Sequence, residues 1–139
     1  MIDYDKFEKS LKRLELQYNN YLTLSNRPDL GALEKDAVAE SAIHRFETCY
    51  DSLWKVLKRY LMEEMGLAEM PNSPKPIFQI AFENKLITDV VQWKKYADAR
   101  TYTSHDYSGS KAAATLNLLG DFTADAIALY TRLTGKQWI

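Results

Sequence analysis

The fold is decided by residues 43–60, which read IHRFETCYDSLWKVLKRY. Apolar side chains recur here in steps of three and four, which places them on one stripe of an α-helix. The stripe consists of Ile43, Phe46, Tyr50, Leu53, Leu57 and Tyr60. We expect this helix to begin near Leu33 and to stop at Gly66, because glycine suits the left-handed conformation that ends many helices.

The same spacing is found on the N-terminal side of this helix. A second stripe consists of Tyr4, Phe7, Leu11, Leu14, Tyr18 and Tyr21. The helix that carries it is expected to end at residues 26–29. Pro28 cannot continue the helical hydrogen bonds, and it biases Arg27 away from helical angles.

On the C-terminal side, the proline-rich residues 70–76 indicate a connection. Ser73 as N-cap, with Pro74 at the first helical position, predicts a short helix through about Leu86. Thr88 is then predicted to cap a fourth helix.

The last helix is expected to start at Ser108 or Ser110 and to stop at Gly135. Its inward positions are Leu116, Leu119, Ala126, Tyr130 and Leu133. Long helices with such stripes and brief connections predict an all-α fold, an up-and-down antiparallel four-helix bundle with an additional short helix.

Composition agrees with one helical domain over residues 1–139. The chain has 46% hydrophobic and 27% charged residues and a net charge of -1, which excludes disorder and an arm that binds nucleic acid by bulk charge. The single cysteine, Cys49, cannot form an internal disulfide. The apolar stretches fall short of the roughly 20 residues of a membrane span, and residues 1–6 do not read as a signal peptide. We therefore expect a cytoplasmic protein with no membrane association.

The chain has two histidines, and these together with Arg100 are the main candidates for a catalytic or binding role. His44 lies beside the central stripe and is interpreted as a packing or exposed histidine, since no ligand spacing accompanies it. Arg100 continues the stripe of the fourth helix, which is formed by Val90, Trp93 and Ala97. A buried guanidinium is costly without a partner, so Arg100 must meet a carboxylate, a groove or a ligand. An intrachain ion pair is the purely structural alternative.

His105 follows Arg100 by five residues, which on an unbroken helix places the two about 140° apart around the axis. They can face one site only if the helix breaks near Thr103 and Ser104, where β-branched and hydroxyl residues make a break plausible. Tyr107 lies two residues further on. The chain has no metal-ligand spacing, so neither a metal nor another cofactor is expected.

The pattern Arg100-x4-His105-x-Tyr107 resembles the signature of the HEPN superfamily, and more narrowly the nucleotidyltransferase substrate-binding protein family. The resemblance covers about residues 7–133. It is carried by residues 45–47 with 53–61, by 73–74 with 81–87, and by Trp93 with 100–107. It implies a four-helix bundle that forms a homodimer and works with a separate minimal nucleotidyltransferase, often as a toxin–antitoxin pair.

The resemblance also implies roles for single residues. Arg100 and His105 would form a metal-independent ribonuclease site at the dimer interface. Tyr107 would accept AMP from the partner, which silences the site. Thr101 stands where the family usually has asparagine. Beside the resemblance, Thr101, Ser104 and Asp106 are candidates for supporting residues; Asp106 either orients His105 or is a solvated turn residue. These roles fit the chemistry, because imidazole can act as a base near pH 7 and guanidinium binds phosphate through paired donors.

Three functions remain open from the sequence. The protein is a ribonuclease toxin, a non-catalytic subunit that binds substrate for the nucleotidyltransferase, or a structural helical dimer. Whether it is an enzyme is therefore left open. It is not itself a nucleotidyltransferase, because Gly109 and Ser110 are not followed by an Asp-x-Asp pattern.

Overall fold

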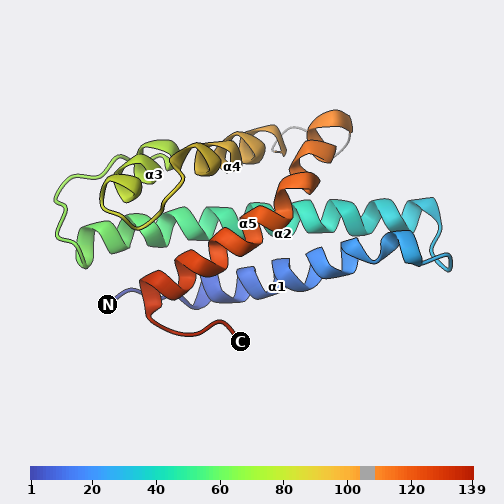
Figure 1. The fold of residues 1–139 in the computed structure, drawn as a ribbon, viewed down its shortest axis with the longest axis horizontal. Helices are drawn as coiled ribbons and strands as arrows, with labels where there is room; N and C mark the ends of the chain where they lie inside the picture. Colours follow the sequence, from blue (N-terminus) through green and yellow to red (C-terminus); the bar gives the residue numbers. More distant parts are fainter. Residues whose placement is uncertain (104–108) are drawn as a thin grey trace.

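The computed structural model describes residues 1–103 and 109–139, and within them the secondary structure is entirely helical. The helices are α1 (Asp5–Leu22), α2 (Ala32–Glu63), α3 (Pro74–Glu83), α4 (Val90–Thr103) and α5 (Gly109–Thr134), with a short 3-10 helix at Leu24–Asn26. Figure 1 shows α1 and α2 side by side as an antiparallel pair, with α3 and α4 in succession along α2 and α5 crossing the assembly obliquely. The predicted all-α bundle with an additional short helix is confirmed.

Two predicted glycine stops are confirmed by the backbone. Gly66 has φ +71° and Gly135 has φ +72°, both in the left-handed region. After α2, the N–H of Leu67 donates to the carbonyl of Leu61 at 3.0 Å, the hydrogen bond that closes a left-handed helix end. These positions explain why α2 and α5 stop where the sequence predicted.

The expected boundaries of α3 and α4 need two corrections. Ser73 precedes α3 as predicted, but the helix ends at Glu83 rather than near Leu86. The cap of α4 is Asp89 and not Thr88, because the carboxylate of Asp89 accepts the N–H of Gln92 at 3.0 Å. The last helix begins at Gly109, so of the two expected starts Ser110 lies inside the helix and Ser108 lies outside the described residues.

The core is centred on Phe122 of α5, which is fully buried. Its ring packs edge-on against Phe46 of α2 at 4.8 Å and against Tyr96 of α4 at 5.1 Å between centroids. Tyr50 and Trp93 complete the cluster. Three helices therefore meet around one aromatic cluster, and it holds α4 against the middle of α2.

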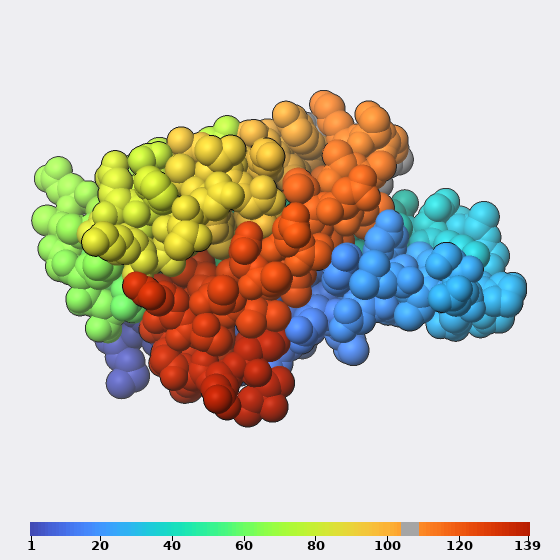
Figure 2. All heavy atoms as spheres, viewed as in Figure 1, coloured from blue at the N-terminus to red at the C-terminus, as the bar shows by residue number. Residues whose placement is uncertain are grey.

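The far end of the α1–α2 pair lacks such cover. Every side chain from 15 to 41 is exposed or half-buried, and Figure 2 shows this end projecting beyond the other helices. The packed part of α2 therefore spans about residues 42–61, and the site described below lies on that part. Among the described residues, no helix is both long and apolar enough to cross a membrane.

Candidate functional site

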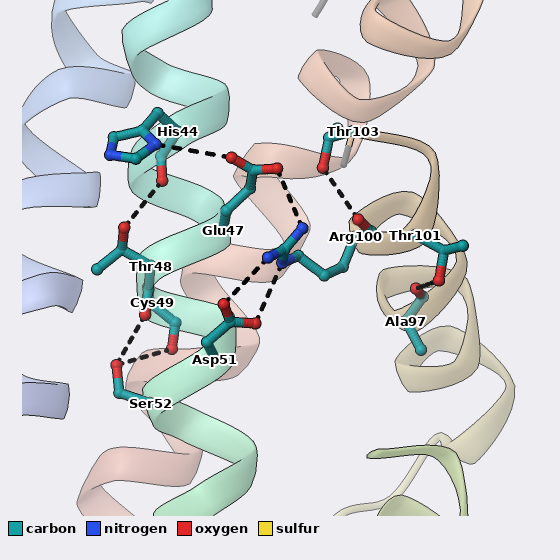
Figure 3. Close-up of polar contacts among 10 residues, drawn as sticks. All are labelled: His44, Glu47, Thr48, Cys49, Asp51, Ser52, Ala97, Arg100, Thr101 and Thr103. Atoms are coloured by element: carbon teal, nitrogen blue, oxygen red, sulfur yellow. Dashed lines mark hydrogen bonds and ion pairs between the residues drawn. The ribbon is translucent and has the colours of Figure 1, made fainter. Parts of the chain in front are cut away.

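Arg100 lies in the last turn of α4 and is bound by two carboxylates of α2 (Figure 3). Its Nε and Nη2 donate to the two oxygens of Asp51, each at 3.1 Å. Its Nη1 donates to Oε2 of Glu47 at 3.1 Å. The paired geometry on Asp51 fixes the plane of the guanidinium, and Glu47 fixes its rotation within that plane.

The sequence of α2 brings these carboxylates together. Phe46 and Tyr50 face the aromatic core, and Glu47 and Asp51 each follow one of them. Residues four apart share a helix face, so the two carboxylates form a pair at the edge of α2 that borders α4.

Burial makes the Glu47 contact the stronger one. The side chain of Glu47 is only 10% exposed, against 28% for Arg100 and 42% for Asp51. A carboxylate buried to this extent requires a charged or hydrogen-bonding partner. Nδ1 of His44 lies 3.6 Å from the other oxygen of Glu47, so a protonated His44 adds a second positive charge. The sequence analysis expected Arg100 to have a partner, and the structure shows ion pairs with Glu47 and Asp51 of the same chain.

The neighbouring threonines bond to their own helix. The hydroxyl of Thr101 donates to the carbonyl of Ala97 at 3.1 Å, and that of Thr103 donates to the carbonyl of Arg100 at 3.2 Å. Thr101 is exposed and Thr103 is buried. The other predicted site residues lie outside the described part of the chain; they are Ser104, His105, Asp106 and Tyr107.

Glu47 and Asp51 were missed as site residues by the sequence analysis. Their i,i+4 spacing beside the central stripe is the only signal that could have singled them out. Many carboxylates in the chain sit at such spacings, so Arg100 could not be assigned to this pair without the tertiary contact.

A pocket of about 520 Å³ opens beside Arg100, between α2, the start of α3 and α4. We call it the Trp54 pocket. Its walls include Asp51, Trp54, Ser73, Lys75, Arg100 and Thr101.

Tyr50 also lines the Trp54 pocket. Burial raises the pKa of the Tyr50 phenol well above its ordinary value, so it stays neutral. Within residues 1–103 and 109–139, no group of three or more histidine, cysteine, aspartate or glutamate side chains is placed to hold a metal ion.

The structure is thus an all-helical bundle with a guanidinium clamped at the end of α4. Residues 2–135 match the family described as nucleotidyltransferase substrate binding protein like. The chain belongs to this family, which confirms the family resemblance and implies partnership with a nucleotidyltransferase.

Individual relatives agree with this assignment. The chain is 30% identical over 108 residues to a Haemophilus influenzae protein named probable ribonuclease HepT, covering 76% of this chain and 74% of that protein. A solved H. influenzae structure, described as revealing the fold of a substrate-binding domain of a nucleotidyltransferase, superposes with a TM-score of 0.84 at 25% identity. That match covers 94% of this chain and 98% of the other. A crystal structure from Thermus thermophilus matches with a TM-score of 0.67 at 28% identity, covering 87% of this chain and 98% of that one.

Proposed function

We propose that this protein is the HEPN-type subunit of a two-component nucleotidyltransferase system and that it cleaves RNA without a metal ion. In this proposal two copies form a homodimer, and Arg100 and His105 of each copy face the interface. The system operates as a toxin–antitoxin pair in the cytoplasm, with the nucleotidyltransferase as the controlling partner.

The observation that carries the proposal is the clamped guanidinium of Arg100. Asp51 and Glu47 hold it at the last turn of α4, five residues before His105. A fixed guanidinium stabilises a developing phosphorane charge better than a mobile one, because no reorganisation is needed during the reaction. The relative named probable ribonuclease HepT adds independent support.

The proposed chemistry is a transesterification. His105, as a neutral imidazole, takes the proton of a ribose 2′-hydroxyl, and the oxygen attacks the adjacent phosphorus. Arg100 stabilises the charge on the phosphoryl oxygens, and the histidine of the other copy, starting as the imidazolium, protonates the leaving 5′-oxygen and becomes neutral. The products are a 2′,3′-cyclic phosphate and a 5′-hydroxyl end.

Control is proposed at Tyr107. Its phenolic oxygen attacks the α-phosphorus of ATP bound to the partner and gives up its proton to solvent. A tyrosyl–AMP bond forms, and the bond to the β-phosphate breaks to release pyrophosphate. The attached nucleotide adds bulk and negative charge beside Arg100, and both oppose the binding of an RNA phosphate.

A second function is favoured by one observation, the hydroxyl of Thr101. It is bonded to the carbonyl of Ala97, and threonine lacks the second donor of the family's usual asparagine. On this alternative the protein is a non-catalytic subunit that presents substrate, or its own Tyr107, to the nucleotidyltransferase.

The two functions are separated by an RNA cleavage assay in EDTA, with wild type and His105→Ala. The ribonuclease proposal expects cleavage that depends on His105 and leaves cyclic phosphate ends. Co-expression with the nucleotidyltransferase should abolish cleavage and add the mass of AMP, and Tyr107→Phe should remain active and unmodified. A stable complex with no cleavage by either form would overturn the ribonuclease and establish the binding subunit.

A further inference from the structure

The Trp54 pocket adjoins the proposed catalytic residue but is not formed by it alone. Arg100 contributes to one wall, while Trp54 comes from α2 and Ser73 and Lys75 come from the start of α3. Its volume of about 520 Å³ lies within the roughly 300–1,000 Å³ typical of small-molecule sites.

The charges around the pocket disfavour a phosphate inside it. Arg100 is already bonded to two carboxylates, Asp51 and Glu47. The ammonium of Lys75 lies 2.6 Å from a carboxylate oxygen of Asp98. These five groups carry three negative charges against two positive ones, so the interior of the pocket suits a neutral group better than an anion.

The uncharged surfaces of the pocket suit an aromatic ring. Trp54 is half-buried and packs against the core, so its indole is held in place rather than free to rotate. A nucleobase can stack on such a ring with little loss of side-chain entropy.

The polar groups at the rim suit a base that carries an exocyclic amine. The carboxylate of Asp51 accepts hydrogen bonds, and carboxylates pair with the amine of cytosine. The hydroxyl of Ser73 makes no capping hydrogen bond to α3, and it can accept or donate at the base edge. Uracil offers a carbonyl where cytosine has the amine, and that carbonyl would face Asp51.

We propose that the Trp54 pocket binds an amino-bearing nucleobase, preferring cytosine to uracil, in the nucleotide next to the phosphate held at Arg100. This inference rests on the proposed function in taking RNA as the ligand. It goes further by assigning a base subsite and a direction of base preference.

The test is a titration of His105→Ala, which cannot cleave on the proposed mechanism, with cytidine and uridine 5′-monophosphates followed by NMR. The chain has three tryptophans, so three indole N–H signals are available. The signal of Trp54 should shift with cytidine monophosphate, while those of Trp93 and Trp138 should stay in place. Binding should be about fivefold or more tighter for cytidine than for uridine monophosphate, the range for one base-edge pairing.

Substitutions at Trp54 provide matched controls. Trp54→Ala should weaken cytidine monophosphate binding about tenfold, the usual effect of losing one stacking ring, whereas Trp54→Phe should retain most of it. Trp138→Phe, on the C-terminal tail, should bind as the parent does. Asp51→Asn should reduce the preference for cytidine over uridine monophosphate. An amide can accept from the amine of cytosine and can also donate to the carbonyl of uracil.

Several results would overturn the inference. They are equal binding of both nucleotides, binding that survives Trp54→Ala, displacement of cytidine monophosphate by inorganic phosphate alone, and a change of oligomeric state in Trp54→Ala without a change in nucleotide binding. The two proposals can fail separately. If the wild type binds nucleotide through Trp54 but cleaves no RNA, only the ribonuclease proposal is refuted. If it cleaves RNA and Trp54→Ala leaves that cleavage unchanged, only the base subsite is refuted.

Discussion

Removing the guanidinium of Arg100 tests the physical basis of the site. Arg100→Ala leaves Glu47, whose side chain is 10% exposed, as a buried carboxylate that has lost the guanidinium. Losing that charged hydrogen bond costs about 1.5–2 kcal/mol. Asp51 is 42% exposed and therefore screened, so its pair adds only about 1 kcal/mol. We expect Arg100→Ala to lower the free energy of unfolding by about 2–3 kcal/mol in total.

For a chain of 139 residues, the unfolding entropy converts this loss to a fall in Tm of about 7–10 °C. The assay is urea denaturation followed by tryptophan fluorescence, together with thermal unfolding by circular dichroism. Arg59→Ala is the matched control, since it breaks an exposed i,i+4 pair with Glu63 within α2. Its Tm should be nearly that of wild type.

The decisive comparison uses Glu47→Gln in both backgrounds. In the wild type this change weakens a charged hydrogen bond and should destabilise by about 1 kcal/mol. In Arg100→Ala it replaces a buried charge that has lost the guanidinium by an amide, and it should restore about 1 kcal/mol. If Glu47→Gln destabilises both backgrounds equally, the carboxylate does not depend on Arg100 and the reasoning is refuted.

Three further predictions follow from single contacts. Lys85 follows α3 by two residues and has φ +64°, and the N–H of Leu86 donates to the carbonyl of Ala81 at 2.9 Å. Lys85→Gly should raise the free energy of unfolding by about 0.5–1 kcal/mol, measured in urea. Phe122→Ala should lower it by about 3–5 kcal/mol, because this fully buried ring lies at the centre of the core. Burial raises the pKa of Cys49 to about 12 from an ordinary value of 9.0, so stability should be complete below pH 9 and fall as the pH rises from 9 toward 12, measured as unfolding free energy against pH.

Each of these predictions has its own control. Lys85→Ala should give no gain, because alanine keeps the strain of a left-handed backbone; a gain equal to that of glycine would contradict the backbone explanation. Phe122→Leu should lose less than the alanine variant if ring packing sets the cost. Cys49→Ala should reduce the alkaline loss of stability, and an unchanged pH profile would show that the thiol contributes nothing. The remaining loss includes the phenols of Tyr50 and Tyr96, whose pKa values are also raised by burial.

The sequence alone determined the helices and the family of this protein. Apolar residues at steps of three and four leave one face of each segment to be buried, and that period excludes strands. Gly66 and Gly135 mark helix ends because glycine adopts the left-handed backbone conformation with the least steric strain. The spacing of Arg100, His105 and Tyr107, together with the segments 45–47, 53–61, 73–74 and 81–87, indicated the family, since such motifs depend on residue order and not on tertiary contacts.

The tertiary structure alone decided the details of the site. Arg100 needed a partner, but its carboxylates lie 49 and 53 residues away along the chain. Local sequence patterns cannot predict such a pairing, because the pairing depends on how α4 docks against α2 around Phe122. The same holds for the cap at Asp89. Thr88 and Asp89 are both good capping residues, and the packing of α4 decides which of them precedes the first helical residue. The Trp54 pocket likewise exists only because α2, α3 and α4 meet there. Local periodicity sets which residues form helices, whereas the contacts that give a charge its partner and a pocket its walls are set by the packing of whole elements.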